Sequence, residues 1–275
     1  MRPVLTDEEG DPLQPLLPSE KPRRGRPGVS HRLVVRGILW LLATGVPGRD
    51  LPEEFGKWKT VFNRFRRWVR EDVGDDLWSA LYRQRDAEGF LDREQWNVDG
   101  TNIRAHRCAG GATNSAPWEP DDHGLGYSKG GFGTKLHVVV ENGQTPRNVI
   151  GTPGQTPDST PFETVLETGP RTPGKTRRWP RSVAGDKGDR GKKNRTWLPR
   201  RRIEDVLASK TNEARDPDFD QHKYRRRNVV ERALGWLKEK RRIATRYEKK
   251  SRHFRAIVKI GIIRWLLNFD LRDSA

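Results

Sequence analysis

The sequence has almost no cysteine, because Cys108 is the only one in 275 residues. A single cysteine can build neither an intrachain disulfide framework nor a cysteine-based zinc site, so both kinds of cross-link are excluded within one chain. Such a composition suits the reducing cytoplasm, where we expect the protein to work. Internal repeats and low-complexity tracts are absent too, so nothing indicates a repeat architecture.

Long hydrophobic runs are also missing. The first twenty residues lack the basic-then-apolar pattern of an export signal. The longest apolar stretch, near residues 254–269, is interrupted by Arg255, Lys259 and Arg264. We therefore expect neither export nor a membrane span.

Negative charge is in deficit. The chain has 54 Lys and Arg against 37 Asp and Glu, which gives a formal net charge of +17. Such an excess favours a polyanionic partner, and nucleic acid is the first candidate. Ten Trp and nine Phe indicate that most of this charge lies on folded structure rather than on a disordered tail.

Residues 1–29 are rich in proline and charge and end in the basic stretch KPRRGRPG, at positions 21–28. This pattern predicts a flexible basic arm. An Arg-Gly-Arg-Pro segment can lie in a narrow minor groove of DNA, and the alternative is a solvated linker.

Residues 30–90 have the apolar spacing of helices. The pattern predicts a helix from Ser30 that Gly45 ends, a short helix over 50–56 and an amphipathic helix over 57–71. Three helices with a compact middle turn are typical of a helix-turn-helix whose third helix enters the major groove. The predicted DNA contacts on that helix are Lys59, Arg64 and Arg67. The alternative is a basic helix that only packs.

After a further helix near 75–88, the pattern changes and indicates a second domain, residues 91–275. Strands are predicted over 96–103, 133–141 and 146–152, the last two joined by an Asn-Gly turn into an antiparallel meander. A helix at 161–167, a short strand at 183–186, and long helices near 220–243 and 252–269 complete a mixed α/β layout.

The stretch Tyr224–Lys238 has an unusual helical face. On one continuous helix, Tyr224, Arg227, Glu231 and Lys238 would share a polar stripe beside an apolar stripe. That position suits a metal-binding carboxylate at the edge of a cleft, with Arg227 and Lys238 able to contact phosphates. Surface ion pairs between Glu231 and its basic neighbours are the alternative.

This spacing resembles the Tyr, Arg, Glu, Lys signature of insertion-sequence DDE transposases. ERALGWLKEKRRIATRYEK, which begins at Glu231, resembles the insertion sequence five family. VDGTNIRAHR with Asp99, GYSKGGFGTKLHVVV, and AGDKG with Asp186 occur in the order that the family has. RDLPEEFGKWKTVFNRFRRW resembles the DNA-binding region of the family, so the likeness spans roughly residues 23–270.

The resemblance implies an α/β chain: a ribonuclease-H-like mixed-sheet catalytic domain after an all-α, helix-turn-helix-like domain. It implies a bacterial transposase, associated with the nucleoid, that binds terminal inverted repeats and target DNA as a homodimer. Asp99, Asp186 and Glu231 would be the catalytic residues and the ligands of Mg²⁺ or Mn²⁺, with two ions. Tyr224, Arg227 and Lys238 would position the DNA end for metal-dependent cleavage and strand transfer.

Two departures from the family pattern leave other functions open. Asp189 and Arg190 follow Gly188 where the family has Tyr and Asp, and Gly48 replaces a common Trp. We expect Asp189 to lie in solvent past the strand end. The alternatives are a catalytically inactive DNA-binding derivative and a metal-dependent site-specific nuclease.

A last basic segment covers residues 177–202, with eleven Lys or Arg and two Asp, so 11 − 2 = +9. It predicts contact with the DNA backbone, and the alternative is a solvated loop.

Overall fold

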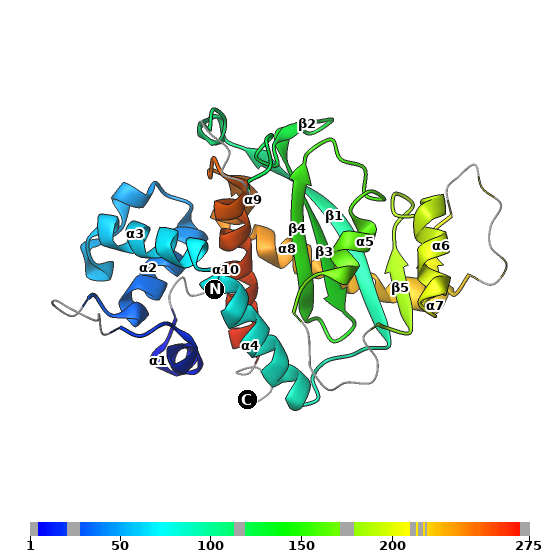
Figure 1. Cartoon of the computed structure of the whole chain (residues 1–275), viewed down its shortest axis with the longest axis horizontal. Helices are drawn as coiled ribbons and strands as arrows, with labels where there is room; N and C mark the ends of the chain where they lie inside the picture. The colour runs from blue at the N-terminus through cyan, green and yellow to red at the C-terminus, as the bar shows by residue number, and fades with distance from the viewer. Residues whose placement is uncertain are drawn as a thin grey trace.

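A mixed β-sheet forms the centre of the structure, a computed structural model that describes residues 5–20, 28–112, 119–170, 179–209, 213, 217 and 219–269 (Figure 1). The strands within these residues are β1 (Gln95–Ala105), β2 (Gly126–Ser128), β3 (Gly131–Glu141), β4 (Pro146–Pro153), β5 (Ser182–Gly185), β6 (Glu204–Leu207) and β7 (Thr245–Arg246).

The sheet has the ribonuclease-H-like strand order. β3 and β4 form the predicted antiparallel meander, and β1 pairs antiparallel to β3. β5 then pairs parallel to β1, and β6 parallel to β5. β6 was not predicted from the sequence, but the family resemblance implied a ribonuclease-H-like mixed sheet. The predicted fold class is therefore confirmed.

Helices cover both faces of the sheet (Figure 1). α5 (Phe162–Glu167) and α6 (Lys192–Arg200) lie on one face, while α8 (Asn228–Lys238) and α10 (Ser251–Phe269) pack on the other. Because side chains alternate along a strand, Trp96 and Val98 of β1 point toward α5, whereas Ile103 points toward the α10 side. Asp99 has the same parity as Ile103, so β1 presents it on the α8 and α10 face.

The basic segment near 177–202 is not a solvated loop where the structure describes it. Residues Lys192–Arg200 form α6, which buries Trp197 and Leu198 against the sheet. The interpretation as a loop is wrong there because two apolar side chains at adjacent positions suffice to anchor a short helix that is otherwise cationic. Positions 177 and 178 lie outside the described residues.

The predicted helices of the N-terminal region are present as α2 (His31–Thr44), α3 (Trp58–Arg70) and α4 (Val73–Ala87). Gly45 ends α2 in the left-handed region, with φ of 70°. The predicted short helix over 50–56 is wrong, since two separate 3₁₀ turns, η2 (Gly48–Asp50) and η3 (Glu53–Phe55), take its place. Pro52 forces the residue before it out of the helical region, so the two turns cannot join.

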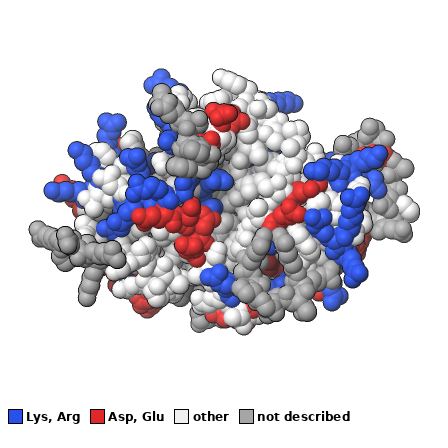
Figure 2. Space-filling view, in the orientation of Figure 1, with Lys and Arg blue, Asp and Glu red and all other residues white. Residues whose placement is uncertain are grey.

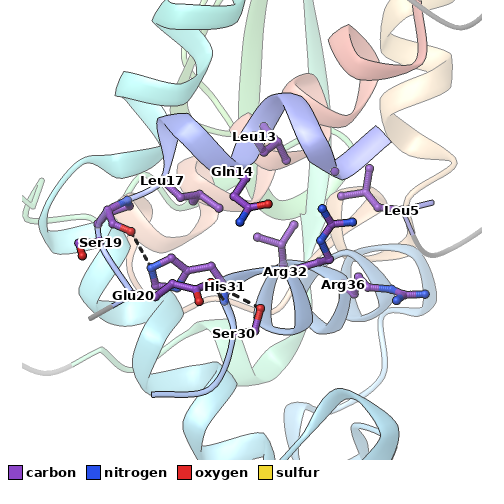
Figure 3. A pocket seen from close by; sticks show the side chains of 13 residues that line it. Leu5, Leu13, Gln14, Leu17, Ser19, Glu20, Ser30, His31, Arg32 and Arg36 are labelled. Atoms are coloured by element: carbon purple, nitrogen blue, oxygen red, sulfur yellow. Dashed lines mark hydrogen bonds between the residues drawn. The ribbon is translucent and has the colours of Figure 1, made fainter. Parts of the chain in front are cut away.

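The predicted flexible arm over residues 1–29 is wrong for residues 5–20. They form α1 (Asp7–Gly10) and η1 (Asp11–Leu16), and Leu5 and Leu13 are buried in the main core. Between this segment and α2 lies a cavity of about 360 Å³, in which the His31 side chain reaches the Pro18 carbonyl at 2.8 Å (Figure 3). The basic stretch at 21–27 lies outside the described residues.

One hydrophobic core runs from the N-terminal helices through α10 to the sheet. α10 contacts α2, α3 and α4 as well as β4, so the helical region packs directly on the last helix of the chain. The division into domains at residues 90 and 91 stays a prediction. Among the described residues, no helix combines the length and the apolar character needed to cross a membrane.

Candidate active site

Asp99 and Asp186 lie at the same level on neighbouring parallel strands. The pairing of β1 with β5 ends where Asn97 faces Ala184, so two further residues along each strand reach Asp99 and Asp186. β7 joins the same side of β1 farther on, at Arg104. Between β5 and β7 this edge of β1 is open, and we call the opening the notch. Asp99 lies inside it.

Glu231 approaches the notch from α8. Val230, Ala233, Leu234 and Leu237 bury one side of this helix, as the sequence predicted. The Glu231 side chain is 50% exposed at the edge of that buried stripe. Arg227 forms an ion pair with Glu231 and lies 3.4 Å from Asp99, measured from Nη1 to Oδ2. One guanidinium therefore links the carboxylates of β1 and α8.

The predicted continuous helix through Tyr224–Lys238 is interrupted at Arg227. The Arg227 N–H donates to the Tyr224 carbonyl, and the Val230 N–H donates to the Arg227 carbonyl. Both are tighter i to i+3 bonds, which separate α7 (Gln221–Arg226) from α8. The Arg227 guanidinium still lies 5.8 Å from the centre of the Tyr224 ring. Lys238, at the far end of α8, is exposed.

The carboxylates of the site influence one another. Burial raises the pKa of Asp99, and the like charges of Asp186 and Glu231 add to this, against the opposing effect of Arg227. Burial alone would lower the pKa of Arg227, but Asp99 and Glu231 attract its charge and raise that pKa above the ordinary value. The site is therefore an acidic cluster that holds the guanidinium group of Arg227.

The donor set of this cluster suits a hard divalent cation, since carboxylate oxygens are the ligands that Mg²⁺ and Mn²⁺ prefer. As they stand, however, no three Asp, Glu, His or Cys side chains within the described part of the chain lie close enough together to hold an ion. Arg227 supplies positive charge between Asp99 and Glu231 instead. The chemistry of the donors fits a metal site. Arg227 occupies the space between two of these carboxylates, so it would have to move before they could share an ion.

Asp158, in the loop after β4, is an acidic residue beside the site that the sequence analysis missed. Its carboxylate accepts a hydrogen bond from Lys135 Nζ at 2.6 Å and lies 3.4 Å from His137 Nδ1. A Cβ at Gly100 would collide with Asp158, so the glycine next to Asp99 allows this close approach. The signal in the sequence was Gly100, because a glycine inside a strand often marks such an approach.

Asp189 is not in solvent, and that prediction is wrong. Its side chain is almost fully buried, with 2% of the residue exposed, and accepts the Asp186 N–H at 3.1 Å. Asp186 in return accepts the N–H groups of Gly188 and Asp189. Burial raises the pKa of Asp189 well above its usual range, and the charge of Asp186 raises it further. The reciprocal bonds close a tight turn over Asp189, which folds it inward.

Arg190, the second residue that departs from the family pattern at this turn, is buried as well. It donates from Nη1 to the Leu207 carbonyl at 2.5 Å, at the end of β6. The turn and the neighbouring strand thus accommodate both Asp189 and Arg190, while Asp186 keeps its place at the strand end.

The predicted DNA contacts of α3 are not equivalent. Lys59 and Arg67 are exposed, whereas Arg64 hydrogen-bonds to His31 and lies over the Trp68 ring. Figure 2 shows Lys and Arg side chains gathered over the region of α3, with a second group over α6 on the other side of the molecule. Arg64 is therefore held against α2, and the other two cations face outward.

Two protein-family models match the chain in succession. Residues 5–78 match a family described as transposases of the IS4/5 family, and residues 95–266 match the transposase DDE domain. The second match alone covers more than half of the chain. This chain belongs to the DDE transposase family. The family match and the ribonuclease-H-like sheet agree with the resemblance seen in the sequence.

Relatives of known sequence include the insertion element IS402 uncharacterized 16.2 kDa protein of Burkholderia cepacia, which is 39% identical over 110 residues. That alignment covers 38% of this chain and 75% of the relative. The uncharacterized protein y4sN of Sinorhizobium fredii is 31% identical over 108 residues, covering 39% of this chain and 82% of y4sN.

A solved structure of a pre-cleavage Mos1 transpososome aligns over 91% of this transposase and 82% of the Mos1 chain. The sequence identity is 14% and the TM-score is 0.28. A score this low does not establish a shared fold, so the strand order of the sheet identifies the fold here.

Proposed function

We propose that this transposase binds the terminal inverted repeats of its own insertion element and cuts and joins phosphodiester bonds with Asp99, Asp186 and Glu231. The observation that supports this is the notch, where a strand register brings two aspartates level and an arginine links one of them to the glutamate of α8. Burial and the like charges of Asp186 and Glu231 raise the pKa of Asp99, and such clusters of carboxylates are typical of functional sites.

In this proposal, the three carboxylates hold Mg²⁺ or Mn²⁺, with two ions. Bound there, the metal would activate the attacking oxygen and neutralise charge on the leaving oxygen of the phosphodiester. Asp99 lies within β1 and Asp186 directly follows β5, and because these two strands pair, the positions of the two aspartates are fixed by the sheet. Glu231 is half exposed on α8 and can turn toward them once Arg227 releases it.

Arg227 then has a second partner available, which is the phosphate of the DNA end. Its guanidinium matches a phosphate as well as a carboxylate, because both accept two parallel hydrogen bonds. Tyr224 lies beside it, and Lys238 is exposed on the same helix as Glu231. We assign these three residues to positioning the DNA end.

The DNA ends must be brought together before they are joined, so we propose a homodimer with two active sites in the synaptic complex. Lys59, Arg64 and Arg67 of α3 are proposed to contact the repeat DNA. The protein would act on DNA in the bacterial cytoplasm, at the nucleoid.

The test is cleavage of a labelled duplex that carries the flanking inverted repeat, with Mg²⁺, Mn²⁺ or EDTA. We expect cleavage at the repeat end with either metal, none in EDTA, and none with Glu231→Ala. Glu239→Ala is the matched control, because Glu239 is an exposed glutamate just beyond the same helix. Specific binding without cleavage in either metal would sink the proposal in favour of an inactive DNA-binding derivative.

A second readout separates strand transfer from cleavage alone. We expect the cleaved ends to join a supercoiled target plasmid, since the free 3′-hydroxyl can occupy the position of the attacking water. Cleavage that never leads to joined products would instead identify a metal-dependent, site-specific nuclease.

A further inference from the structure

A concave surface that includes none of the notch residues lies between α3 and the start of α10. It is a groove of about 530 Å³ with two basic walls. α3 contributes one wall, and the segment that leads from β7 into α10 contributes the other. The six cations that line the groove are Arg66, Arg67, Arg70, Lys249, Lys250 and Arg252. The two helices that contribute to these walls, α3 and α10, are in contact.

Acidic side chains of the described residues only partly offset these charges. Glu119, the acidic side chain in the lining, is buried and accepts the N–H groups of Ser251 and Arg252. At the rim, Glu71 lies 3.8 Å from Arg67 and Asp72 lies 2.8 Å from Arg252. Four other lining cations add to the positive charge. Burial lowers the pKa of His253 in the groove, and the charges of Arg66 and Lys250 lower it further, as a positive potential requires.

The wall formed by Lys249, Lys250 and Arg252 was not predicted from the sequence. The helix-turn-helix interpretation places DNA contacts on α3 alone, whereas Lys249 and Lys250 belong to the segment of the DDE domain that follows β7. Two facing rows of cations repel each other, and a polyanion lying between them removes that repulsion.

We propose that this groove binds the sugar–phosphate backbone of duplex DNA, held jointly by the helical region and the DDE domain. This inference rests on the proposed function, because it takes the DNA of that function as the occupant. Lys and Arg side chains contact phosphates independently of sequence, so the groove adds affinity and orientation to the complex and reads no bases.

The test is the binding of a fluorescent duplex by the full chain, measured by anisotropy over a range of salt concentrations. We expect Lys249→Glu/Lys250→Glu to weaken binding about tenfold. The slope of log K against log salt should fall by about 2, because each phosphate that is no longer neutralised reduces it by roughly 0.9. The decrease in affinity should be equal for the inverted repeat and for a scrambled duplex. Arg66→Glu, from the opposite wall, should act in the same direction.

Lys250→Glu and Arg83→Glu form a matched pair, since both change the net charge by the same amount and Arg83 is exposed on α4 outside the groove. Each variant is checked by thermal melting. The groove proposal is overturned if the properly folded Lys249→Glu/Lys250→Glu protein keeps the wild-type affinity and slope, or if it loses affinity for the repeat alone. Wild-type protein that binds no DNA would overturn the proposed function as well. If the groove variants bind DNA with wild-type affinity while cleavage still requires Glu231, only the groove proposal is overturned and the proposed function stands.

Discussion

α3 and the notch carry charge of opposite sign and hold it in different ways. The cations Lys59 and Arg67 lie on the exposed face of α3, where water solvates them. In the notch, Asp99 is largely removed from water, and its charge is opposed by two other carboxylates and balanced by Arg227. Exposed charge can be placed on any helix at little energetic expense. Clustered, desolvated charge has to be held in place by the backbone. Asp99 is held in this way, because β1 is paired on both sides of the notch.

The largest effect that can break this comparison is expected from Asp99→Asn. If the notch carries the chemistry and the helices carry binding, this variant should lose at least about a thousandfold in cleavage rate, roughly 4 kcal/mol in the barrier. Its affinity for repeat DNA should stay within about twofold of the wild type. Cleavage kinetics and anisotropy measure the two effects, with Asp121→Asn as an exposed control. Cleavage by Asp99→Asn at the wild-type rate would show that the notch is not the active site.

The next effect concerns a charge that is buried without any catalytic role. Arg246 of β7 is fully buried and donates to the carbonyls of His123, Gly124, Glu248 and Lys249. Arg246→Met would remove this donor from all four carbonyls, although the Gly124 carbonyl still accepts the Thr134 hydroxyl, so we expect a loss of about 3–5 kcal/mol in the free energy of unfolding. Urea denaturation measures it, and Arg83→Met on the surface should change little. A small loss for Arg246→Met would mean that water replaces the guanidinium.

A third effect tests the contact between the helical region and the sheet, where Tyr82 of α4 donates a hydrogen bond to Glu141 of β3. Burial raises the pKa of Glu141 from 4.5 to about 7. The folded state therefore binds a proton that the unfolded state releases, and stability should fall as pH rises from about 4.5 through about 7. This pH-dependent loss is expected to be roughly 3 kcal/mol at most.

Glutamine at position 141 cannot ionise, so the unfolding free energy of Glu141→Gln should depend less on pH in that window. Above about pH 7, the unfolding free energy of the variant should be higher than that of the wild type. Urea denaturation from about pH 4.5 to about pH 8 measures the difference, with the exposed Glu88→Gln as the control. Parallel curves for Glu141→Gln and the wild type would show that Glu141 stays ionised when the chain folds.

The smallest effect sharpens the comparison within α3. Lys59→Ala/Arg67→Ala should weaken DNA binding several-fold, about 1 kcal/mol, with no change in melting temperature, because both side chains are exposed. Arg64→Ala should lower the melting temperature instead, since Arg64 contacts His31 and Trp68. Equal effects of the two variants on affinity and on melting would mean that Arg64 is as available to DNA as its neighbours.

Much of the fold was predictable because the local pattern and the final structure agree. The alternating and continuous apolar runs of β1, β3 and β4 predict strands, and Gly45 predicts the end of α2. The prediction failed where distant contacts override local pattern. Leu5 and Leu13 turn a proline-rich segment into part of the core, and Trp197 does the same for a basic one. Neither contact leaves a periodic signal within its own segment.

The sequence by itself determined the net positive charge, the order of the three acidic blocks and the resemblance of these blocks to a family pattern. Those properties depend only on residue type and on spacing along the chain. Tertiary structure decided that Arg227 links two of the acids, that Asp189 folds inward beneath its turn, and that Lys250 faces α3 across a groove. Each of these depends on where separate elements meet, and long-range packing sets those positions.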